Sequence, residues 1–243
     1  MSKHAFYIEP AQWSLRPELT GNELAHARVL RVKEGESVLL YDGEGRAAEC
    51  RVVKLARKSI QLEIESEKNF PRPLFRPILA LALSKAVRRS FFMEKAEELG
   101  AWEIWLWQAE RSQGKLVPQV AEACKNQLIA GLKQSGNPWL CKVKEARRPQ
   151  DVIKLSESMA NKMLPWEKRA GTAPLQIETL QKPGDTVFVI GPEGGFAPHE
   201  SELFLEASFL PVSLGQRVLR CETAATLCLA LHWWASQSCL AGQ

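Results

Sequence analysis

The pattern of hydrophobic and polar positions divides the chain into two regions. Up to about Phe70, apolar residues form short runs or alternate with polar ones, as at 37–41, 47–55 and 59–64. Such runs are typical of short strands, and Asp42-Gly43-Glu44-Gly45 between the first two predicts a hairpin turn. We therefore expect a small β-barrel or curled sheet in this region.

After Pro77 the pattern changes to alternating strands and helices. Residues 78–83 are continuously apolar, as in a parallel strand that is covered on both faces. Ser84 is a candidate N-cap for a helix over 85–99, and Gly100 a candidate helix stop. Further strands are predicted at 102–107, 162–165, 186–190 and 211–214, and further helices at 118–133, from 199 onward and at 223–235. This alternation predicts an α/β domain on a mostly parallel sheet.

A proline-rich stretch separates the two regions. Three prolines stand at positions 71, 73 and 77, a composition that favours an extended connector. We place the domain boundary there and predict one domain over residues 1–72 and a second over residues 73–243.

The charge balance gives only local signals. The chain has 32 Lys and Arg against 28 Asp and Glu, a net charge of +4, so indiscriminate polyanion binding is not implied. One basic cluster, Lys85, Arg88 and Arg89, begins the helix predicted at 85–99, where the helix dipole favours acidic residues instead. This placement suits binding of an anion such as phosphate; loosely placed surface charge is the alternative. A second cluster lies within 142–148.

Several classes of protein are not expected. The longest apolar run is far shorter than the roughly 20 residues of a membrane span, and no secretory signal is visible, so we expect a cytoplasmic protein without a membrane partner. The six cysteines contain no C-x-x-C pair, and the four histidines are scattered. We therefore expect reduced, mostly buried thiols and no metal site.

Two glycine-containing loops near the C-terminus are the candidate site. The apolar run 187–190 leads into Gly191-Pro192-Glu193-Gly194-Gly195, with three glycines within five residues. Glycines allow a ligand to approach backbone groups, and open α/β sheets bind ligands at the carboxyl ends of their strands. A tight turn without a ligand is the alternative.

The second loop follows the strand predicted at 211–214. It reads Gly215-Gln216-Arg217-Val218-Leu219-Arg220-Cys221-Glu222, and the small residues Ala224 and Ala225 come next, at a helix start. Two such loops at adjacent strand ends make a ligand pocket more probable than either loop alone.

These motifs resemble the signature of the SPOUT methyltransferase superfamily, and specifically that of the bacterial 16S ribosomal RNA uridine-N3 methyltransferases. The matching segments are Ile190-Gly191-Pro192-Glu193-Gly194-Gly195 and Leu214-Gly215-x-Arg217-Val218-Leu219-Arg220-x-Glu222-Thr223-Ala224. Supporting segments are His26-Ala27-Arg28-Val29-Leu30-Arg31, the stretch 94–100 and Glu110-Arg111-Ser112. The resemblance spans nearly the whole chain and keeps the order of the motifs.

The resemblance implies an N-terminal PUA-like RNA-binding β-barrel, an α/β domain with a deep trefoil knot, and a homodimer. It implies S-adenosylmethionine as cofactor and 16S rRNA as substrate, either free or in the assembled 30S subunit. The candidate cofactor-binding residues are Leu164, Ile190, Gly191, Pro192, Glu193, Gly194, Leu214, Gly215, Val218, Leu219, Arg220 and Thr223. The candidate RNA-binding residues are Arg31, Lys85, Arg88, Arg89 and Arg111.

Arg220 and Glu222 are the candidate catalytic residues, as stabiliser of a developing anion and as orienting group. Two other functions stay open: a ribose 2′-O-methyltransferase of the same superfamily, and a ribosome-assembly RNA-binding protein without catalysis. The chain also departs from the family pattern, because Gln134-Ser135 is followed by Gly136-Asn137-Pro138-Trp139-Leu140 in place of an arginine and Val-Pro. The segment 163–169 follows the family only loosely.

Overall fold

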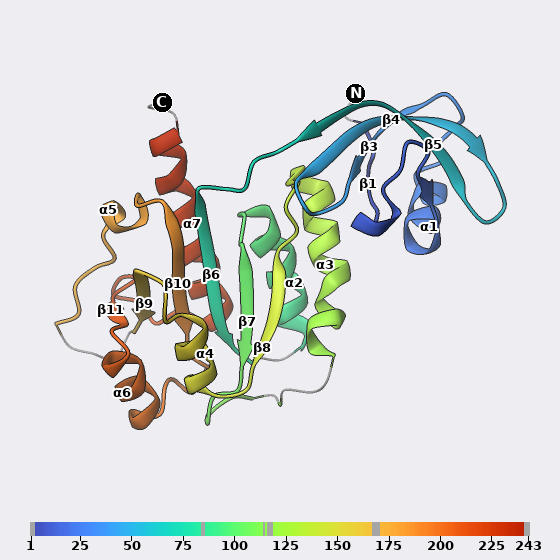
Figure 1. Cartoon of the computed structure of the whole chain (residues 1–243). Helices are drawn as coiled ribbons and strands as arrows, with labels where there is room; N and C mark the ends of the chain where they lie inside the picture. The colour runs from blue at the N-terminus through green and yellow to red at the C-terminus, as the bar shows by residue number, and fades with distance from the viewer. Residues whose placement is uncertain (1–2, 84–85, 114, 116–118, 167–170, 241–243) are drawn as a thin grey trace. The chain divides into compact units, whose positions relative to one another are not determined.

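The computed structural model describes residues 3–83, 86–113, 115, 119–166 and 171–240 (Figure 1). The chain forms two compact units. The N-terminal unit comprises residues 1–72 and 129–140, and the C-terminal unit comprises residues 73–128 and 141–243. This division differs from the predicted domains in one segment, 129–140, which packs with the N-terminal unit.

The N-terminal unit contains a five-stranded sheet. Its strands are β1 (Ala5–Tyr7), β2 (Glu18–Leu19), β3 (Ser37–Tyr41), β4 (Arg46–Leu55) and β5 (Ile60–Asn69), in the order β1-β3-β4-β5-β2. The two shortest strands, β1 and β2, lie at the edges of this sheet and do not pair with each other. The described strands therefore form an open sheet rather than a closed barrel. Strands β3, β4 and β5 confirm the three predicted apolar runs.

One helix of this unit was not predicted. Helix α1 (Gly21–Val29) buries only Leu24 and Ala27 in the core, and the rest of it is polar or exposed. Such a sequence carries almost no helical periodicity. A short 3₁₀ helix, η1 (Pro10–Gln12), precedes it.

The predicted hairpin turn joins β3 to β4 and explains why residues 129–140 belong to this unit. The buried Asp42 carboxylate accepts the backbone N–H groups of Glu44 and Arg46 at 2.8 and 3.0 Å. The turn also bonds to the segment 138–140, because the Leu140 N–H donates to the Gly43 carbonyl at 2.9 Å. An ideal Cβ on Gly45 would lie 2.8 Å from Cε2 of Trp139. The turn glycines are therefore required by tertiary packing.

The C-terminal unit contains a six-stranded sheet, in which every pairing is parallel. Its strands are β6 (Phe75–Ala82), β7 (Glu103–Trp107), β8 (Lys142–Ala146), β9 (Asn161–Pro165), β10 (Gly184–Ile190) and β11 (Leu210–Val212), in the order β11-β9-β10-β6-β7-β8. The predicted α/β class with a mostly parallel sheet is thus confirmed. All carboxyl ends of these strands lie at one edge of the sheet.

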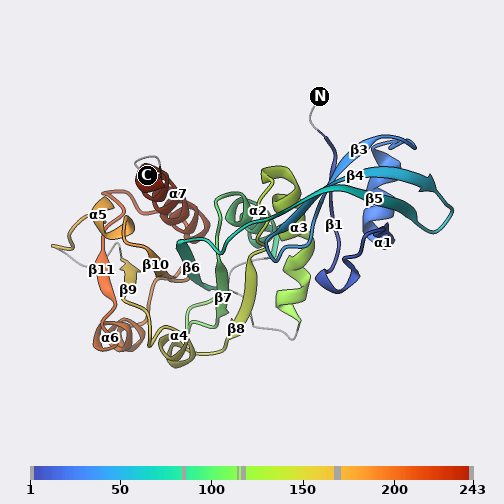
Figure 2. The ribbon, with the colours of Figure 1, turned by 45° about the horizontal axis from the view of Figure 1, so that its top comes forward.

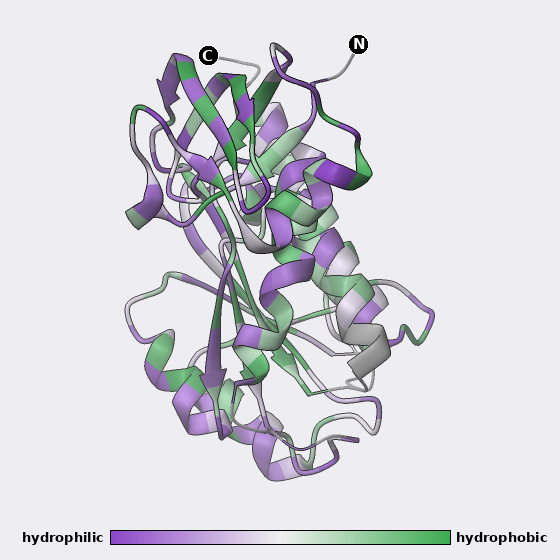
Figure 3. Cartoon of the chain, turned by 90° about the vertical axis from the view of Figure 1, so that its right-hand side faces the viewer, coloured by the Kyte–Doolittle hydropathy of each residue, from purple (hydrophilic) through white to green (hydrophobic). Residues whose placement is uncertain are grey.

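Helices cover both faces of this sheet. The helices of this unit are α2 (Ala86–Glu98), α4 (Pro149–Leu155), α5 (Ile177–Leu180), α6 (Pro198–Glu206) and α7 (Cys221–Leu240), and α3 (Val120–Ser135) begins in this unit and ends in the N-terminal one. Figure 2 shows α2 and α7 on one face and α4 and α6 on the other. The central strands are accordingly apolar and coloured green in Figure 3.

One prediction near β6 needs correction. Strand β5 extends to Asn69 and β6 begins at Phe75, so Pro77 lies in a strand and the connector is shorter than expected. The candidate N-cap Ser84 lies outside the described residues.

The acidic end of α2 has a structural explanation. Glu97 is fully buried, and its carboxylate accepts the backbone N–H of Cys141 at 2.8 Å. Glu98 pairs with Lys95 at 2.7 Å. At least one of the acidic residues that oppose the helix dipole is therefore required for packing.

Candidate functional site

A pocket opens at the carboxyl ends of β9 and β11. It is open to solvent, and about 320 Å³ of empty space, open solvent included, lies among its lining atoms. Its lining residues are Pro165, Trp166, Leu214, Gly215, Arg217, Leu219 and Ala224. The lining combines apolar and aromatic side chains with one arginine, a composition that suits an organic ligand with a polar end.

The loop after β11 forms most of this pocket. The segment 173–175 holds its start, since the Ser213 N–H donates to the Ala173 carbonyl at 2.9 Å. Gly215 has φ +117°, and an ideal Cβ there would meet nothing within 4 Å. The backbone conformation therefore requires a glycine at position 215, while the space beside this residue stays open.

The glycines of the loop after β10 have different roles. An ideal Cβ on Gly191 would lie 2.9 Å from the Phe196 ring, and one on Gly194 would lie 3.0 Å from Cβ of Arg111. Gly195 has φ +72° and donates its N–H to the Pro192 carbonyl at 2.8 Å. Phe196 in turn stacks on Trp107 with ring centroids 6.2 Å apart. The loop is thus packed closely against the end of β7.

Cys221, the first residue of α7, lies at the end of the second loop, and the Glu193 carboxylate of the first loop is near enough to act on its thiol. Sγ of Cys221 lies 3.2 Å from Oε2 of Glu222. Burial, together with this hydrogen bond and the nearby Glu193 carboxylate, raises the pKa of the Cys221 thiol to about 12. The thiol therefore stays protonated at neutral pH, and it lies close to one carboxylate from each loop.

The structure places the predicted cofactor residues in three different environments. Leu214, Gly215 and Leu219 line the pocket. Leu164 and Ile190 are buried at the ends of β9 and β10, outside the lining. The others belong to the two loops and their junction with α7 without lining the pocket: Gly191, Pro192, Glu193, Gly194, Val218, Arg220 and Thr223.

The candidate catalytic residues lie on either side of Cys221, with Arg220 directly before α7 and Glu222 in its first turn. Arg220 is exposed and forms no ion pair with another described residue. Glu222 is partly buried beside the Cys221 thiol. The guanidinium is accessible to a ligand, and the carboxylate is held in place.

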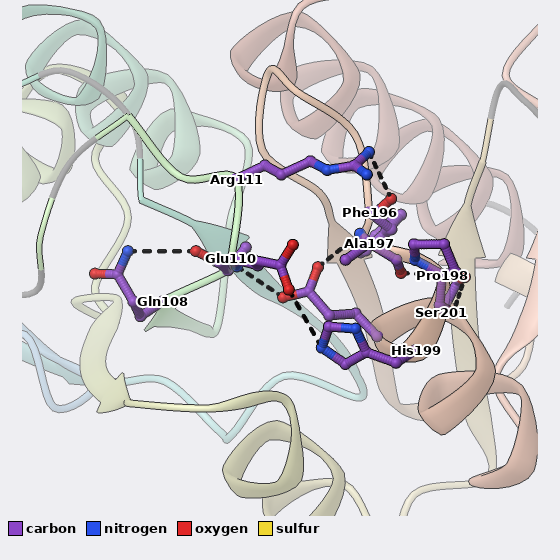
Figure 4. Close-up of polar contacts among 10 residues, drawn as sticks. Gln108, Glu110, Arg111, Phe196, Ala197, Pro198, His199 and Ser201 are labelled. Atoms are coloured by element: carbon purple, nitrogen blue, oxygen red, sulfur yellow. Dashed lines mark hydrogen bonds and ion pairs between the residues drawn. The ribbon is translucent and has the colours of Figure 1, made fainter.

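The predicted RNA-binding residues are only partly described. Arg31 is exposed and adopts φ +56° just after α1. Lys85 lies outside the described residues, as do the side chains of Arg88 and Arg89. Arg111 is exposed, but its guanidinium Nη1 donates to the carbonyls of Gly194 and Phe196, at 3.4 Å each (Figure 4).

Four lining residues were absent from the candidate set, namely Pro165, Trp166, Arg217 and Ala224. Trp166 directly follows the strand β9, and its N–H donates to the Val212 carbonyl at 3.0 Å. An aromatic residue at the carboxyl end of a predicted strand was a usable signal for it. Arg217 and Ala224 belong to the second glycine motif itself.

Other expected features can be compared with the structure. No disulfide joins any of the six cysteines, all of which lie in the described ranges, and five of them are buried. Within the described ranges, no group of three His, Cys, Asp or Glu side chains could hold a metal ion. None of the described helices is both long enough and apolar enough to span a bilayer.

Two family models match this chain. Residues 71–233 match the model of the RNA methyltransferase domain, and residues 19–65 match that of the RNA methyltransferase PUA domain. Together the two models define a class of protein: an RNA methyltransferase with an N-terminal PUA domain.

Individual relatives agree with this class. The chain is 31% identical to ribosomal RNA small subunit methyltransferase E of Mycobacterium bovis over 90% of this chain and 88% of the relative. The chain is also similar to the same-named Neisseria gonorrhoeae protein bound to S-adenosylmethionine, with TM-score 0.79, 27% identity and coverage of 94% and 96%. A Legionella pneumophila protein solved with bound cofactor SAM gives TM-score 0.86, 26% identity and coverage of 97% and 98%. The chain belongs to the ribosomal RNA small subunit methyltransferase E family of RNA methyltransferases.

Proposed function

We propose that this protein transfers a methyl group from S-adenosylmethionine to N3 of a uridine in 16S ribosomal RNA. The observation that carries the proposal is the pocket at the ends of β9 and β11, which the loop after β11 lines with Leu214, Gly215 and Leu219. Family membership supplies the reaction class, and the resemblance of the loop motifs to SPOUT uridine-N3 enzymes supplies the target atom.

The residues of the pocket suit this cofactor. When bound, S-adenosylmethionine supplies an activated methyl group. Trp166, Leu214 and Leu219 offer apolar surface for a flat base, and the open space beside Gly215 gives access to backbone groups. Arg217 is the charged residue of the lining and suits a carboxylate. The remaining candidate residues of both loops complete this site in the proposal.

Arg220 has the role of transition-state stabiliser. N3 lies on the Watson–Crick edge, so the target uridine must be unpaired or flipped out of a helix before it can react. Loss of the N3 proton to water spreads negative charge onto O2 and O4 of the uracil. An accessible guanidinium beside the cofactor pocket would stabilise that charge more than the neutral base.

Glu222 is the orienting group of the site in this proposal. Its Oε2 already accepts a hydrogen bond from the Cys221 thiol, which holds the carboxylate at the start of α7. A fixed carboxylate two residues from Arg220 keeps a negative charge near the proposed position of the uridine. The proposed RNA contacts are Arg31 in the N-terminal unit and the basic start of α2.

The finer features of the proposal concern fold and assembly. We propose a SPOUT-type trefoil knot in the C-terminal unit and a homodimer that acts in the cytoplasm. The large apolar side chains of Phe91 on α2 and of Trp233 and Trp234 on α7 support the dimer, because they are 65%, 44% and 61% exposed. The two helices pack together, and exposed apolar patches mark interaction sites.

The test is incubation of the protein and S-adenosylmethionine with undermethylated 30S subunits and, separately, with naked 16S RNA. Mass mapping of nuclease fragments then locates the methyl group on a base or on a ribose. The proposal expects one uridine modified at N3. A methyl group at a ribose 2′ oxygen would instead indicate the sister reaction, and failure to bind cofactor would favour an assembly factor without catalysis.

A further inference from the structure

The loop after β7 is attached to the glycine loop after β10 by two charged side chains. In the sheet, β6 lies between these two strands. The first attachment is Arg111, whose Nη1 donates to the carbonyls of Gly194 and Phe196. The second is Glu200 on α6, which directly follows the glycine loop. Figure 4 shows Arg111 directed at Phe196, with Glu110 beside the start of α6.

Glu200 uses both of its carboxylate oxygens in this attachment. It is 2% exposed. Its Oε1 accepts the Glu110 N–H at 2.9 Å, and its Oε2 accepts the Ala197 N–H at 2.9 Å. One buried carboxylate therefore joins the end of the β7 loop to the N-terminus of α6, where the helix dipole also favours a negative charge.

Arg111 acts on the glycine loop itself. Its Cβ lies so near Gly194 that a side chain there would crowd it, with an ideal Cβ at 3.0 Å. The two hydrogen bonds, at 3.4 Å, are longer and weaker than typical N–H···O bonds, and Arg111 is exposed. Loss of them should cost little global stability, but it would free the two carbonyls that set the direction of the loop backbone.

We propose that Arg111 is a positioning residue, which together with Glu200 holds the glycine loop in its cofactor-binding conformation. The inference rests on the proposed function, because the loop is assigned to S-adenosylmethionine. It replaces the expectation that Arg111 binds RNA: the guanidinium contacts loop carbonyls, and its effect on catalysis passes through the cofactor site.

The experiment compares Arg111→Ala, Arg111→Lys and wild type in three measurements. Calorimetry gives the Kd of S-adenosylmethionine, and RNA titrations at several salt concentrations give the salt slope. Steady-state kinetics separates kcat from the KM for the cofactor. For Arg111→Ala we expect a Kd and a KM about tenfold higher, with kcat at saturating cofactor and the RNA salt slope unchanged. Lysine should recover part of the affinity, because a single nitrogen makes both contacts.

Glu200→Gln provides the second arm, with Glu202→Gln on the exposed side of the same helix as matched control. Gln keeps one acceptor and turns an NH2 group toward a backbone N–H, so cofactor affinity should fall in Glu200→Gln and stay at the wild-type value in Glu202→Gln. If Glu200→Gln does not fold, Arg111→Ala decides.

The results separate this inference from the proposed function. If wild type does not bind S-adenosylmethionine, both are wrong. If wild type binds it and Arg111→Ala binds it equally well, while the salt slope falls by about 0.7, Arg111 is an RNA contact and only the inference is overturned. A joint loss of melting temperature and cofactor affinity that lysine does not relieve would also overturn it.

Discussion

Two glycine turns, one in each unit, differ in what surrounds them. Gly45 in the β3–β4 hairpin has φ +94° and is covered by the Trp139 indole, whereas Gly215 after β11 has φ +117° and nothing within 4 Å of an ideal Cβ. The left-handed backbone conformation at both positions requires glycine. Only the first is also required by packing, so similar motifs serve stability in one unit and leave room for a ligand in the other.

The comparison makes opposite predictions for the two turns. Changes at the hairpin should alter the free energy of unfolding, and changes in the loop after β11 should alter binding and turnover.

The largest effect is expected for Arg220, at the end of the open loop. Arg220→Ala should lower kcat by about 10²–10³, as removal of an anion-stabilising donor does elsewhere. Arg220→Lys keeps a point charge but loses the planar fork, so it should restore RNA affinity without restoring turnover. Single-turnover kinetics and RNA titration measure the two quantities. Recovery of turnover by lysine would show that Arg220 is a phosphate contact.

Gly45→Ala should lower the free energy of unfolding by about 3 kcal/mol, because left-handed strain and overpacking against Trp139 add. Urea denaturation measures it. The matched control is Gly35→Ala, which has φ +83° but no neighbour within 4 Å and should cost only the strain, about 1 kcal/mol. An equal loss of unfolding free energy in the two variants would show that packing against Trp139 does not require Gly45.

Gly215→Ala should weaken S-adenosylmethionine binding about tenfold, through backbone strain and lost space at the pocket. Gly184→Ala is the matched control. Gly184 is the first residue of β10, at the edge of the sheet away from the pocket, and it also has a positive φ, +120°, and no atom within 4 Å of an ideal Cβ. Both variants should lose similar stability, and only Gly215→Ala should lose cofactor affinity in calorimetry. The same affinity loss in both would mean that strain alone acts.

The smallest effect concerns the basic start of α2. Replacement of Lys85, Arg88 and Arg89 by Gln should reduce the salt slope of RNA binding by about 2, if each contacts one phosphate of single-stranded RNA. Cofactor affinity should stay unchanged. Replacement of Lys142, Lys144 and Arg147 by Gln serves as control, and an equal loss of slope there would indicate a general charge effect.

The sequence predicted the elements whose burial produces a clear pattern. The continuous apolar run of β6 and the alternation in β4 are direct consequences of sheet packing. Strand β8 gave no such signal, because it is an edge strand in which only Ala146 is buried. The grouping of 129–140 with the N-terminal unit depends on Trp139 packing against a turn almost 100 residues earlier.

For the site, the motifs located the loops but not the role of each residue. Glycines were recognisable as turn positions, yet the sequence does not show that Gly191 makes room for the Phe196 ring or that Gly194 makes room for Arg111. We expect Gly194→Val to act by displacing Arg111, since Gly194 is not among the glycines with positive φ. Long-range contacts of this kind depend on the folded chain and leave no local pattern.

The most direct test of the central claim is a crystal structure of this protein with S-adenosylmethionine. The account predicts the cofactor in the pocket at the ends of β9 and β11, in contact with Trp166, Leu214, Gly215 and Leu219, with Arg220 at the mouth beside the methyl group. A cofactor bound elsewhere, or one in this pocket with its methyl group directed away from Arg220, would contradict it.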